Sequence, residues 1–304
     1  MGTPLGKHFI FYFCEKKLGK KFFKNEFLTN LFNKIGLTLI SKIDFNNPFA
    51  RYRGAKIEYG DTIEDIYEDL QVGYEYDQTN TDPFGQSKPN VQALYHTINL
   101  EMQYKTTIND SLIRRAIRTP NGLTDLVTSC VAALRDSADY DEYISTIKLL
   151  SNDSIYGKIV YLGAATGNKK TDSANLLAAI KNVGSSMRFM SKEFNQMKTN
   201  QVCPFDKQLL VIDYKYKDSI DLDVLAGTYN LSKADIAQRV IEVEGFIENT
   251  GLACVVVDER GFKLNQALVD GGMIYNPQGL YTNHFYNNWE IISWSLYRNA
   301  VAIK

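Results

Sequence analysis

One helical pattern, over residues 121–153, constrains the fold more than any other stretch of the chain. No proline interrupts it, and its apolar residues recur at spacings of three and four: Leu123, Leu126, Val127, Cys130, Val131 and Leu134, then Tyr140, Tyr143, Ile144, Ile147 and Leu150. This spacing places one apolar stripe along an α-helix. About thirty residues at ~1.5 Å each predict a helix of ~45 Å, close to the width of a domain. The weakly apolar residues 136–139 leave open a kink, or two shorter amphipathic helices.

A second unusual pattern lies at residues 94–108, where apolar residues occupy the even positions and polar residues most of the odd ones. Alternation of this kind predicts a β-strand, and fifteen residues would make it ~45 Å long, well beyond the usual strand. A β-arm that reaches away from the body of the protein would explain such a length. His96 lies on the more apolar face of this strand, so we expect a packed histidine and not a ligand.

Composition places the chain among ordinary globular proteins. It has 304 residues, 44% apolar and 23% charged, which predicts one or two domains with ample core. The net charge of −1 excludes a broad basic field for nucleic acid or for an anionic membrane. No apolar run approaches the ~18 residues of a membrane span. Cys14, Cys130, Cys203 and Cys254 form no CxxC pair, so we expect a reducing cytosol, with Cys130 and Cys254 as small core residues.

Further elements follow from periodicity and turn chemistry. We expect helices at residues 22–35, at 62–70 (with Thr62 and Asp65 as a capping box), around Leu176, Leu177, Ile180 and Val183, and over most of 222–242. We expect strands at 37–45, 158–162, 208–213 and 252–257, a turn at 46–48 and a loop at 78–90. The last forty residues are rich in aromatic and β-branched residues. The basic run between Lys16 and Lys24 is either a solvated face or an arm that lies on a neighbouring subunit.

Several motifs suggest chemistry and fail on spacing. Residues 163–171 resemble a phosphate-binding loop, but three residues instead of four separate Gly163 from Gly167, and Asn168 precedes Lys169. Residues 221–240 mimic a helix-turn-helix, yet the second helix offers few basic or amide side chains. The acidic residues at 218–223 lack the glycine and distal glutamate of a calcium loop. With three histidines and no Gly-x-Ser-x-Gly elbow, we nominate no catalytic, cofactor-binding or metal-binding residue, and we expect a protein that is not an enzyme.

Eight pieces of the chain, in order between residues 26 and 303, resemble the major capsid proteins of phi29-like tailed phages. They are residues 27–37 (FLTNLFNKIGL), 46–48 (NNP), 62–67 (TIEDIY), 89–96 (PNVQALYH), 139–150 (DYDEYISTIKLL), 243–246 (VEGF), 276–281 (NPQGLY) and 297–302 (YRNAVA). The resemblance implies an α+β fold of the Hong Kong 97 type. Its parts would be an N-terminal arm and short helix (1–36), an extended β-loop (37–108), a P domain with a spine helix (109–170 and 262–304) and an A domain (171–261).

The same resemblance implies a function. It predicts the major head protein of a small tailed phage, which is made in the host cytoplasm and associates with itself into pentamers and hexamers of an icosahedral shell. A scaffolding protein, a portal and packaged double-stranded DNA without sequence-specific contact would be its partners, with no membrane and no cofactor. The strand at 94–108 would pair with the stretch before Gln78, and the spine helix would pack on Tyr281, Tyr286, Trp289 and Trp294. The arm before Phe27 is shorter than the N-terminal segment of the family, where that segment straps subunits together. A chain that stops at Lys304, without the immunoglobulin-like domain of some relatives, implies a bare shell protein. The alternatives are an encapsulin-like compartment shell and, outside this class, a helix-turn-helix regulator.

Overall fold

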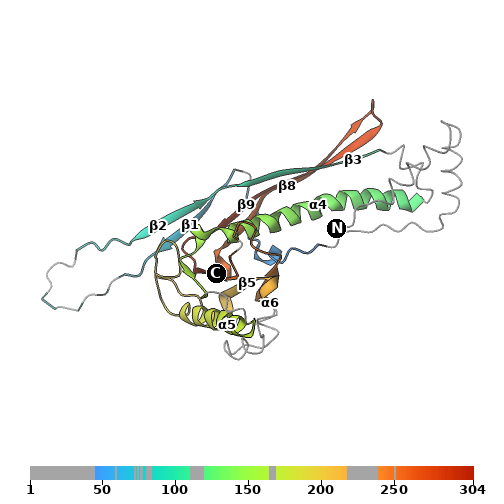
Figure 1. Cartoon of the computed structure of the whole chain (residues 1–304). Helices are drawn as coiled ribbons and strands as arrows, with labels where there is room; N and C mark the ends of the chain where they lie inside the picture. Colours follow the sequence, from blue (N-terminus) through green and yellow to red (C-terminus); the bar gives the residue numbers. More distant parts are fainter. Residues whose placement is uncertain are drawn as a thin grey trace, which may run out of the picture. The chain divides into compact units, whose positions relative to one another are not determined.

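The computed structural model describes residues 45–58, 60–71, 73, 75, 78–79, 84–109, 120–163, 169–217, 239–249 and 251–304, without the side chains of 120–127 and 169–170 (Figure 1). These residues fall into two compact units. The larger holds residues 45–103, 137–270 and 287–304, and the smaller includes 104–136 and 271–286. The predicted helix at 22–35, the strand before Phe45, most of the glycine loop at 163–171 and nearly all of the helix-turn-helix-like segment lie outside the described residues.

A five-stranded mixed sheet forms the centre of the larger unit, in the order β4-β10-β7-β5-β6. Its strands are β4 (Lys158–Val160), β5 (Gln208–Asp213), β6 (Val240–Val243), β7 (Cys254–Asp258) and β10 (Ala300–Ile303). β7 lies antiparallel between β10 and β5, while the two outer pairs are parallel. Every residue of β5, β7 and β10 is buried, because apolar residues on both faces are covered. The predicted strands at 158–162, 208–213 and 252–257 are confirmed, whereas residues 240–242 belong to β6 and not to the predicted helix.

Each face of this sheet carries its own hydrophobic core and its own helix. α4 (Pro120–Ser151) contributes Tyr143, Ile147 and Leu150 to the core on one face. α5 (Lys169–Ser186) contributes Leu176, Ile180 and Val183 to the other. The strands alternate accordingly, since Val255 and Val257 of β7 belong to the first core while Cys254 and Val256 belong to the second. Both helices are therefore where the apolar spacing predicted them.

α4 is one continuous helix, which confirms the prediction of a single long helix over the alternative of two shorter ones. Its last turn is tied down: the Ser151 hydroxyl donates to the carbonyl of Ile147 (2.7 Å), and the Asn249 amide donates to the carbonyl of Ser151 (3.2 Å). Asn152 then caps the short 3-10 helix η2 (Asp153–Ile155). Of the four aromatic residues on which this helix was expected to pack, Trp294 lies in the same hydrophobic core as Tyr143, Ile147 and Leu150, whereas Tyr281, Tyr286 and Trp289 are not part of that core.

A three-stranded sheet follows the order β3-β9-β8, with β3 (Leu100–Ile108), β8 (Phe262–Asn276) and β9 (Tyr281–Trp294). The strand predicted at 94–108 is in fact two strands, since residues 97–99 separate β3 from β2 (Val91–His96). The cause is a change of partner. Asn99 binds the backbone of Ile292 through both amide atoms (2.7 and 2.8 Å), which fixes the point where the chain leaves β1 and joins β9. The predicted alternation itself persists, with His96 and Ile108 on the buried side.

The helix predicted at residues 62–70 is wrong. Residues 63–68 form strand β1 (Ile63–Glu68), which pairs antiparallel with β2. Ile63, Ile66 and Tyr67 have helical spacing, but backbone pairing with β2 and burial of every second residue decide the structure. Of the strand predicted at 94–108, residues 94–96 pair with the stretch before Gln78 as implied, whereas residues 100–108 pair with β9 instead.

Short helical turns complete the larger unit: η1 (Ala50–Tyr52), η3 (Phe205–Lys207), α6 (Tyr214–Lys217) and η4 (Glu259–Gly261). The turn predicted at 46–48 is present, and Asn47 stabilises it by accepting a hydrogen bond from the backbone N–H of Phe49 (2.9 Å). None of the helices among the described residues combines the length and apolar character that a membrane span requires.

Candidate functional site

The β1–β2 hairpin has two different faces. Ile63 pairs with His96 at its base and Glu68 with Val91 toward its tip. Because side chains alternate across a strand, one face carries Ile63, Asp65 and Tyr67, and the opposite face carries Glu64, Ile66 and Glu68. Every residue of β1 and β2 on this second face is exposed. We call it the outer face of the hairpin: Glu64, Ile66, Glu68, Val91, Ala93 and Tyr95.

The inner face is fixed to the larger unit. The Tyr67 ring stacks on Tyr297 at 5.3 Å between centroids, and its hydroxyl donates to Asp69 (3.0 Å) and to the carbonyl of Asn200 (3.2 Å). His96 is buried, and its Nδ1 lies 2.9 Å from the hydroxyl of Ser293, which confirms a packed histidine. These contacts leave the hairpin one free face.

Asp65 adds an electrostatic contact on the inner face. Its carboxylate lies 3.6 Å from the ammonium of Lys263 and 4.0 Å from the imidazole of His96. These surroundings lower the pKa of Asp65 to about 2. The largest cause is the neighbouring His96, and the Ser295 hydroxyl and Lys263 act in the same direction, whereas burial opposes them. The base of the hairpin is thus held by stacking, hydrogen bonds and charge.

Apolar side chains on the outer face have no cover in the described part of the chain. Ile66 is 60% exposed, Val91 52% and Tyr95 65%. Ile66 lies opposite Ala93, and Tyr95 lies opposite Glu64 and donates to its carboxylate (2.9 Å). Single exposed apolar residues are common, but a group of them rimmed by carboxylates on one sheet face is typical of an interaction surface.

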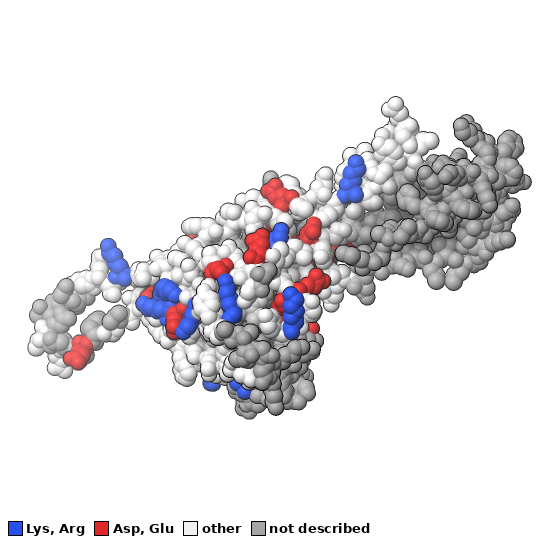
Figure 2. Space-filling view, in the orientation of Figure 1, with Lys and Arg blue, Asp and Glu red and all other residues white. Residues whose placement is uncertain are grey.

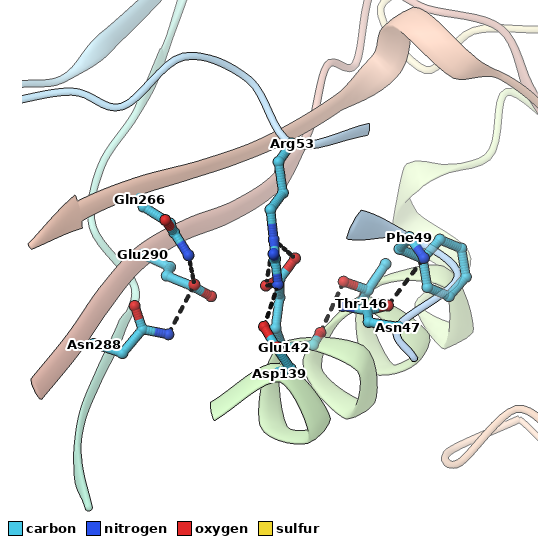
Figure 3. A network of polar contacts seen from close by, with 9 residues as sticks. All are labelled: Asn47, Phe49, Arg53, Asp139, Glu142, Thr146, Gln266, Asn288 and Glu290. Atoms are coloured by element: carbon cyan, nitrogen blue, oxygen red, sulfur yellow. Dashed lines mark hydrogen bonds and ion pairs between the residues drawn. The ribbon is translucent and has the colours of Figure 1, made fainter. Parts of the chain in front are cut away.

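A buried charge network lies where the chain enters the hairpin (Figure 3). Arg53 reaches from the extended segment after η1 to α4, where its Nε donates to both oxygens of Glu142 (3.0 and 2.9 Å) and its Nη2 contacts Glu142 and Asp139. The Glu142 side chain is 2% exposed, so the guanidinium provides its charge compensation. These carboxylates raise the pKa of Arg53 against the opposing effect of burial. Beyond Arg53 the segment runs along β8, and the backbone N–H groups of Gly54 and Ile57 donate hydrogen bonds to carbonyl groups of that strand.

Glu290 on β9 is the second buried carboxylate of this region. It is 2% exposed, and its Oε1 accepts hydrogen bonds from Asn288 (2.8 Å) and Gln266 (3.3 Å), as Figure 3 shows. Its Oε2 is buried and has no partner among the described residues. The pKa of Glu290 is raised to about 7, mainly by burial and next by the negative charge of Glu142.

A cavity of about 530 Å³ opens beside this network. The Tyr52 and Phe262 rings form an aromatic wall, stacked at 5.4 Å. Five cations share the lining, namely Arg51, Arg53, Lys207, Arg239 and Arg260. Burial raises the pKa of Tyr52, so this wall stays neutral at physiological pH.

Metal-binding clusters and reactive cysteine thiols would be signs of catalysis among the described residues. They contain no group of three or more His, Cys, Asp or Glu side chains that could hold a metal ion. Cys203 and Cys254 are buried and burial raises the pKa of both thiols, which opposes nucleophilic reactivity. Cys254 is therefore a core residue, as the sequence predicted, whereas Cys130 is partly exposed. On the face drawn in Figure 2, Lys and Arg are interspersed with Asp and Glu.

Sequence reasoning missed the charge network. Arg53, Glu142 and Glu290 come together from positions far apart in the chain, so no local motif marks them. One signal was available. Asp139 and Glu142 lie at i, i+3 spacing beside the apolar stripe of the long helix, where a carboxylate that becomes buried needs a partner.

Solved structures define the class of the fold. The chain is similar to the capsid structure of Staphylococcus phage Andhra, with a TM-score of 0.74 and 11% identity over 89% of this chain and 87% of that one. It is also similar to the capsid structure of Cyanophage P-SCSP1u, with a TM-score of 0.62 and 8% identity over 89% and 91%. The mixed sheet with a helix on each face, extended by a long hairpin, is thus a fold found in phage capsids.

The sequence identifies the family within that class. The family of the Phi29-like phage major capsid protein matches residues 16–304, and the chain belongs to it. The major capsid protein of Bacillus phage PZA is 31% identical over 92% of this chain and 63% of its own length. That of Streptococcus phage Cp-1 is 26% identical over 90% and 81%. The chain spans 61–63% of the length of its three Bacillus phage relatives.

Proposed function

We propose that this protein is the repeating subunit of an icosahedral phage head and that it folds in the Hong Kong 97 manner. Its activity is association with itself through heterologous contacts, in which one surface of each copy meets a different surface of the next and rings of five and six close. Family membership supports the shell, and similarity to two capsid folds supports the architecture.

The outer face of the β1–β2 hairpin is the observation that carries the proposal. The hairpin is held on one face by Tyr67 and His96 and exposes Ile66, Val91 and Tyr95 on the other. The larger unit already covers the inner face of the hairpin, so the exposed apolar residues of the outer face are best explained by a second copy that covers them.

We assign the parts of the subunit from the resemblance and the elements together. Residues 1–36 would be the N-terminal arm and short helix, and 37–108 the extended loop that includes β1 and β2. Residues 109–170 and 262–304 would be the P domain, with α4 as its spine, and 171–261 the A domain. β10, from the end of the chain, lies in one sheet with β5 and β7, so the two domains would share a core.

The same proposal fixes the partners and the location. A scaffolding protein, a portal and packaged double-stranded DNA accompany the subunit, which is made in the host cytoplasm and resides in the virion. A net charge of −1 suits a container wall that faces DNA without gripping it. The role is structural, with no enzymatic step.

Electron microscopy of the purified protein, alone and co-expressed with its neighbouring genes, tests the proposal. Wild type is expected to form closed shells or rings. A variant in which Asn-Gly replaces residues 70–89 keeps the β1–β2 pairing through a two-residue turn. We expect it to stay soluble and folded, with a wild-type melting temperature, and to form no shells. Unfolding of this variant would contradict the assignment of the segment as an arm.

A pair of substitutions tests the outer face without shortening the chain. Ile66→Ser with Tyr95→Ser is expected to abolish shells. The matched control is Phe189→Ser with Met190→Ser, which removes side chains of similar exposure (70% and 56%) outside the hairpin and is expected to leave shells intact. Shells from the first variant would refute the role of the outer face.

A further inference from the structure

One residue, Glu290, is connected to both ends of the β1–β2 hairpin. Where the chain leaves the hairpin, the backbone N–H of Asn99 donates to the carbonyl of Glu290 (3.2 Å). Where the chain enters, the N–H of Ile57 donates to the carbonyl of Gln266 (3.0 Å), and the side chain of the same Gln266 donates to Oε1 of Glu290 (3.3 Å). A change in the charge of this carboxyl can therefore act on both ends of the hairpin.

The charged groups around Glu290 leave it short of a cation. Arg53, in the entry segment of residues 53–57, is the cation that acts on it, but Asp139 and Glu142 of α4 already bind this guanidinium (Figure 3). β8 and β9 face the carboxyl with one amide each, and both amides donate to Oε1. Oε2 is buried without a hydrogen-bond partner among the described residues. One guanidinium is thus shared among three carboxylates, and a proton on Glu290 removes the excess negative charge.

The protonation state of Glu290 decides where the guanidinium of Arg53 is needed. While the carboxyl is neutral, Glu142 and Asp139 hold the guanidinium without competition. Once the carboxyl is ionised, Oε2 competes for the guanidinium, because burial separates this atom from solvent. Asp139 is the partner that gives way, since its side chain is 42% exposed and water can replace the guanidinium there, whereas that of Glu142 is 2% exposed.

We propose that Glu290 is a proton-operated latch for the hairpin: the bound proton keeps Arg53 on α4, and its loss to solvent draws the guanidinium toward Oε2 and loosens the entry segment. Acidic conditions therefore fix the hairpin, and alkaline conditions free it. No covalent bond changes. The inference goes beyond the proposed function, since it concerns the conformation of a single subunit whether or not shells form.

The entry segment has the properties of a part that opens locally. Two backbone–backbone hydrogen bonds join it to β8, from Gly54 to Leu264 (2.8 Å) and from Ile57 to Gln266, and residues 54–56 are exposed. Segments with few buried contacts and exposed hydrogen bonds open at a lower free energy than a core does. The alternative is that ionised Glu290 weakens the whole subunit without any local movement, and the buried central sheet would report that.

Hydrogen exchange of unassembled subunits between pH 5.5 and pH 8.5, corrected for the intrinsic exchange rate, tests the latch. The pKa of Glu290, raised to about 7, lies within this range. In wild type the protection of the amides of Gly54 and Ile57 is expected to fall at least about tenfold as pH rises. Glu290→Gln cannot ionise, so its protection at both amides should stay constant. The matched control, Glu248→Gln, changes an exposed carboxylate and should follow wild type.

Low concentrations of urea separate local opening from global unfolding. The amides of Leu210 and Ala253, which are hydrogen bonded in the central sheet, exchange through global unfolding and should exchange faster as urea is added. Those of Gly54 and Ile57 should not respond at pH 8.5, because local opening exposes little surface. If all four amides respond equally, the whole subunit is destabilised and the latch is refuted.

A second variant tests whether Arg53 is the group that moves. Asp139→Asn removes its exposed partner and should shift the midpoint of the change in protection to lower pH, since ionised Glu290 then meets less competition for the guanidinium. An unchanged midpoint, or the same pH dependence in Glu290→Gln as in wild type, would overturn the inference. Because the Asp139 side chain is partly exposed, this variant also provides the test if Glu290→Gln fails to fold.

Discussion

Substitution of Glu290 by glutamine is expected to stabilise the protein at neutral and alkaline pH. Glu290 is 2% exposed and accepts two hydrogen bonds through Oε1, from Asn288 and Gln266, while Oε2 has no partner in the described structure. Glutamine keeps the acceptor for both donors and has the shape of the protonated acid. The substitution therefore removes the cost of a buried negative charge while keeping its contacts.

The size of the effect follows from the pKa. Burial, with help from Glu142, raises the pKa of Glu290 from its ordinary value of 4.5 to about 7. Between those two values the folded state holds a proton that the unfolded state has released, so the free energy of unfolding falls as pH rises. At 1.36 kcal/mol per unit, the loss is about 3 kcal/mol by pH 7 and is complete just above it. Below pH 4.5 both states are protonated and the wild type loses nothing.

Urea denaturation of unassembled subunits between pH 4 and pH 8.5 measures this. The free energy of unfolding of wild type is expected to fall by about 3 kcal/mol relative to the Glu290→Gln variant across that range, with the two proteins equal at pH 4. Glu248→Gln, which changes an exposed carboxylate, is the control and should follow wild type. A constant difference between wild type and Glu290→Gln at all pH values would refute the argument, because it would mean that Glu290 has the same pKa in the folded and unfolded states.

Three further changes have expected outcomes. Gly157→Ala should lower the free energy of unfolding by about 3 kcal/mol in thermal melting, because a Cβ there would lie 2.2 Å from the backbone of residues 194–195, which cannot yield as a side chain can. Tyr67→Phe keeps the stacking but loses two hydrogen bonds, so we expect a loss of about 1 kcal/mol and faster hydrogen exchange in β1. Arg53→Met leaves Glu142 buried without its partner and should cost about 3–5 kcal/mol in denaturant titration.

The long helix and the central strands could be predicted because their signals are local and strong. From Leu123 to Leu150, α4 repeats its apolar residues with no proline, and residues 209–212 and 252–257 are apolar at every position, as strands covered on both faces are. Packing agrees with the local preference at these sites, so nothing overrides it.

Where the prediction failed, a distant partner decides the structure. Residues 63–70 have helical spacing and no apolar alternation, and only the antiparallel partner β2, about thirty residues on, selects the strand. The break between β2 and β3 likewise depends on Asn99 meeting Ile292, which lies 193 residues away. Contacts at this separation leave no periodic trace in either segment.

The charge network is another contact between residues far apart in the sequence. Its position, where the chain enters the hairpin, suits a role in setting the register of that segment. A buried ion pair often contributes less stability than apolar residues of equal volume, so Arg53 and Glu142 are poorly explained as a source of stability alone. They are better explained as a device that fixes register. Gly54 and Ile57 bind β8 through backbone atoms, which would accept a shift by one residue, but such a shift would point Arg53 to the opposite face and leave Glu142 without compensation. The hairpin begins six residues after Ile57, so the register at Arg53 also sets where Ile66 and Tyr95 reach the surface.

Replacement of both Arg53 and Glu142 by Met should therefore restore most of the stability that Arg53→Met loses, while the amides of Gly54 and Ile57 exchange faster with solvent than in wild type. Full protection of those two amides in the double variant would show that the backbone alone sets the register.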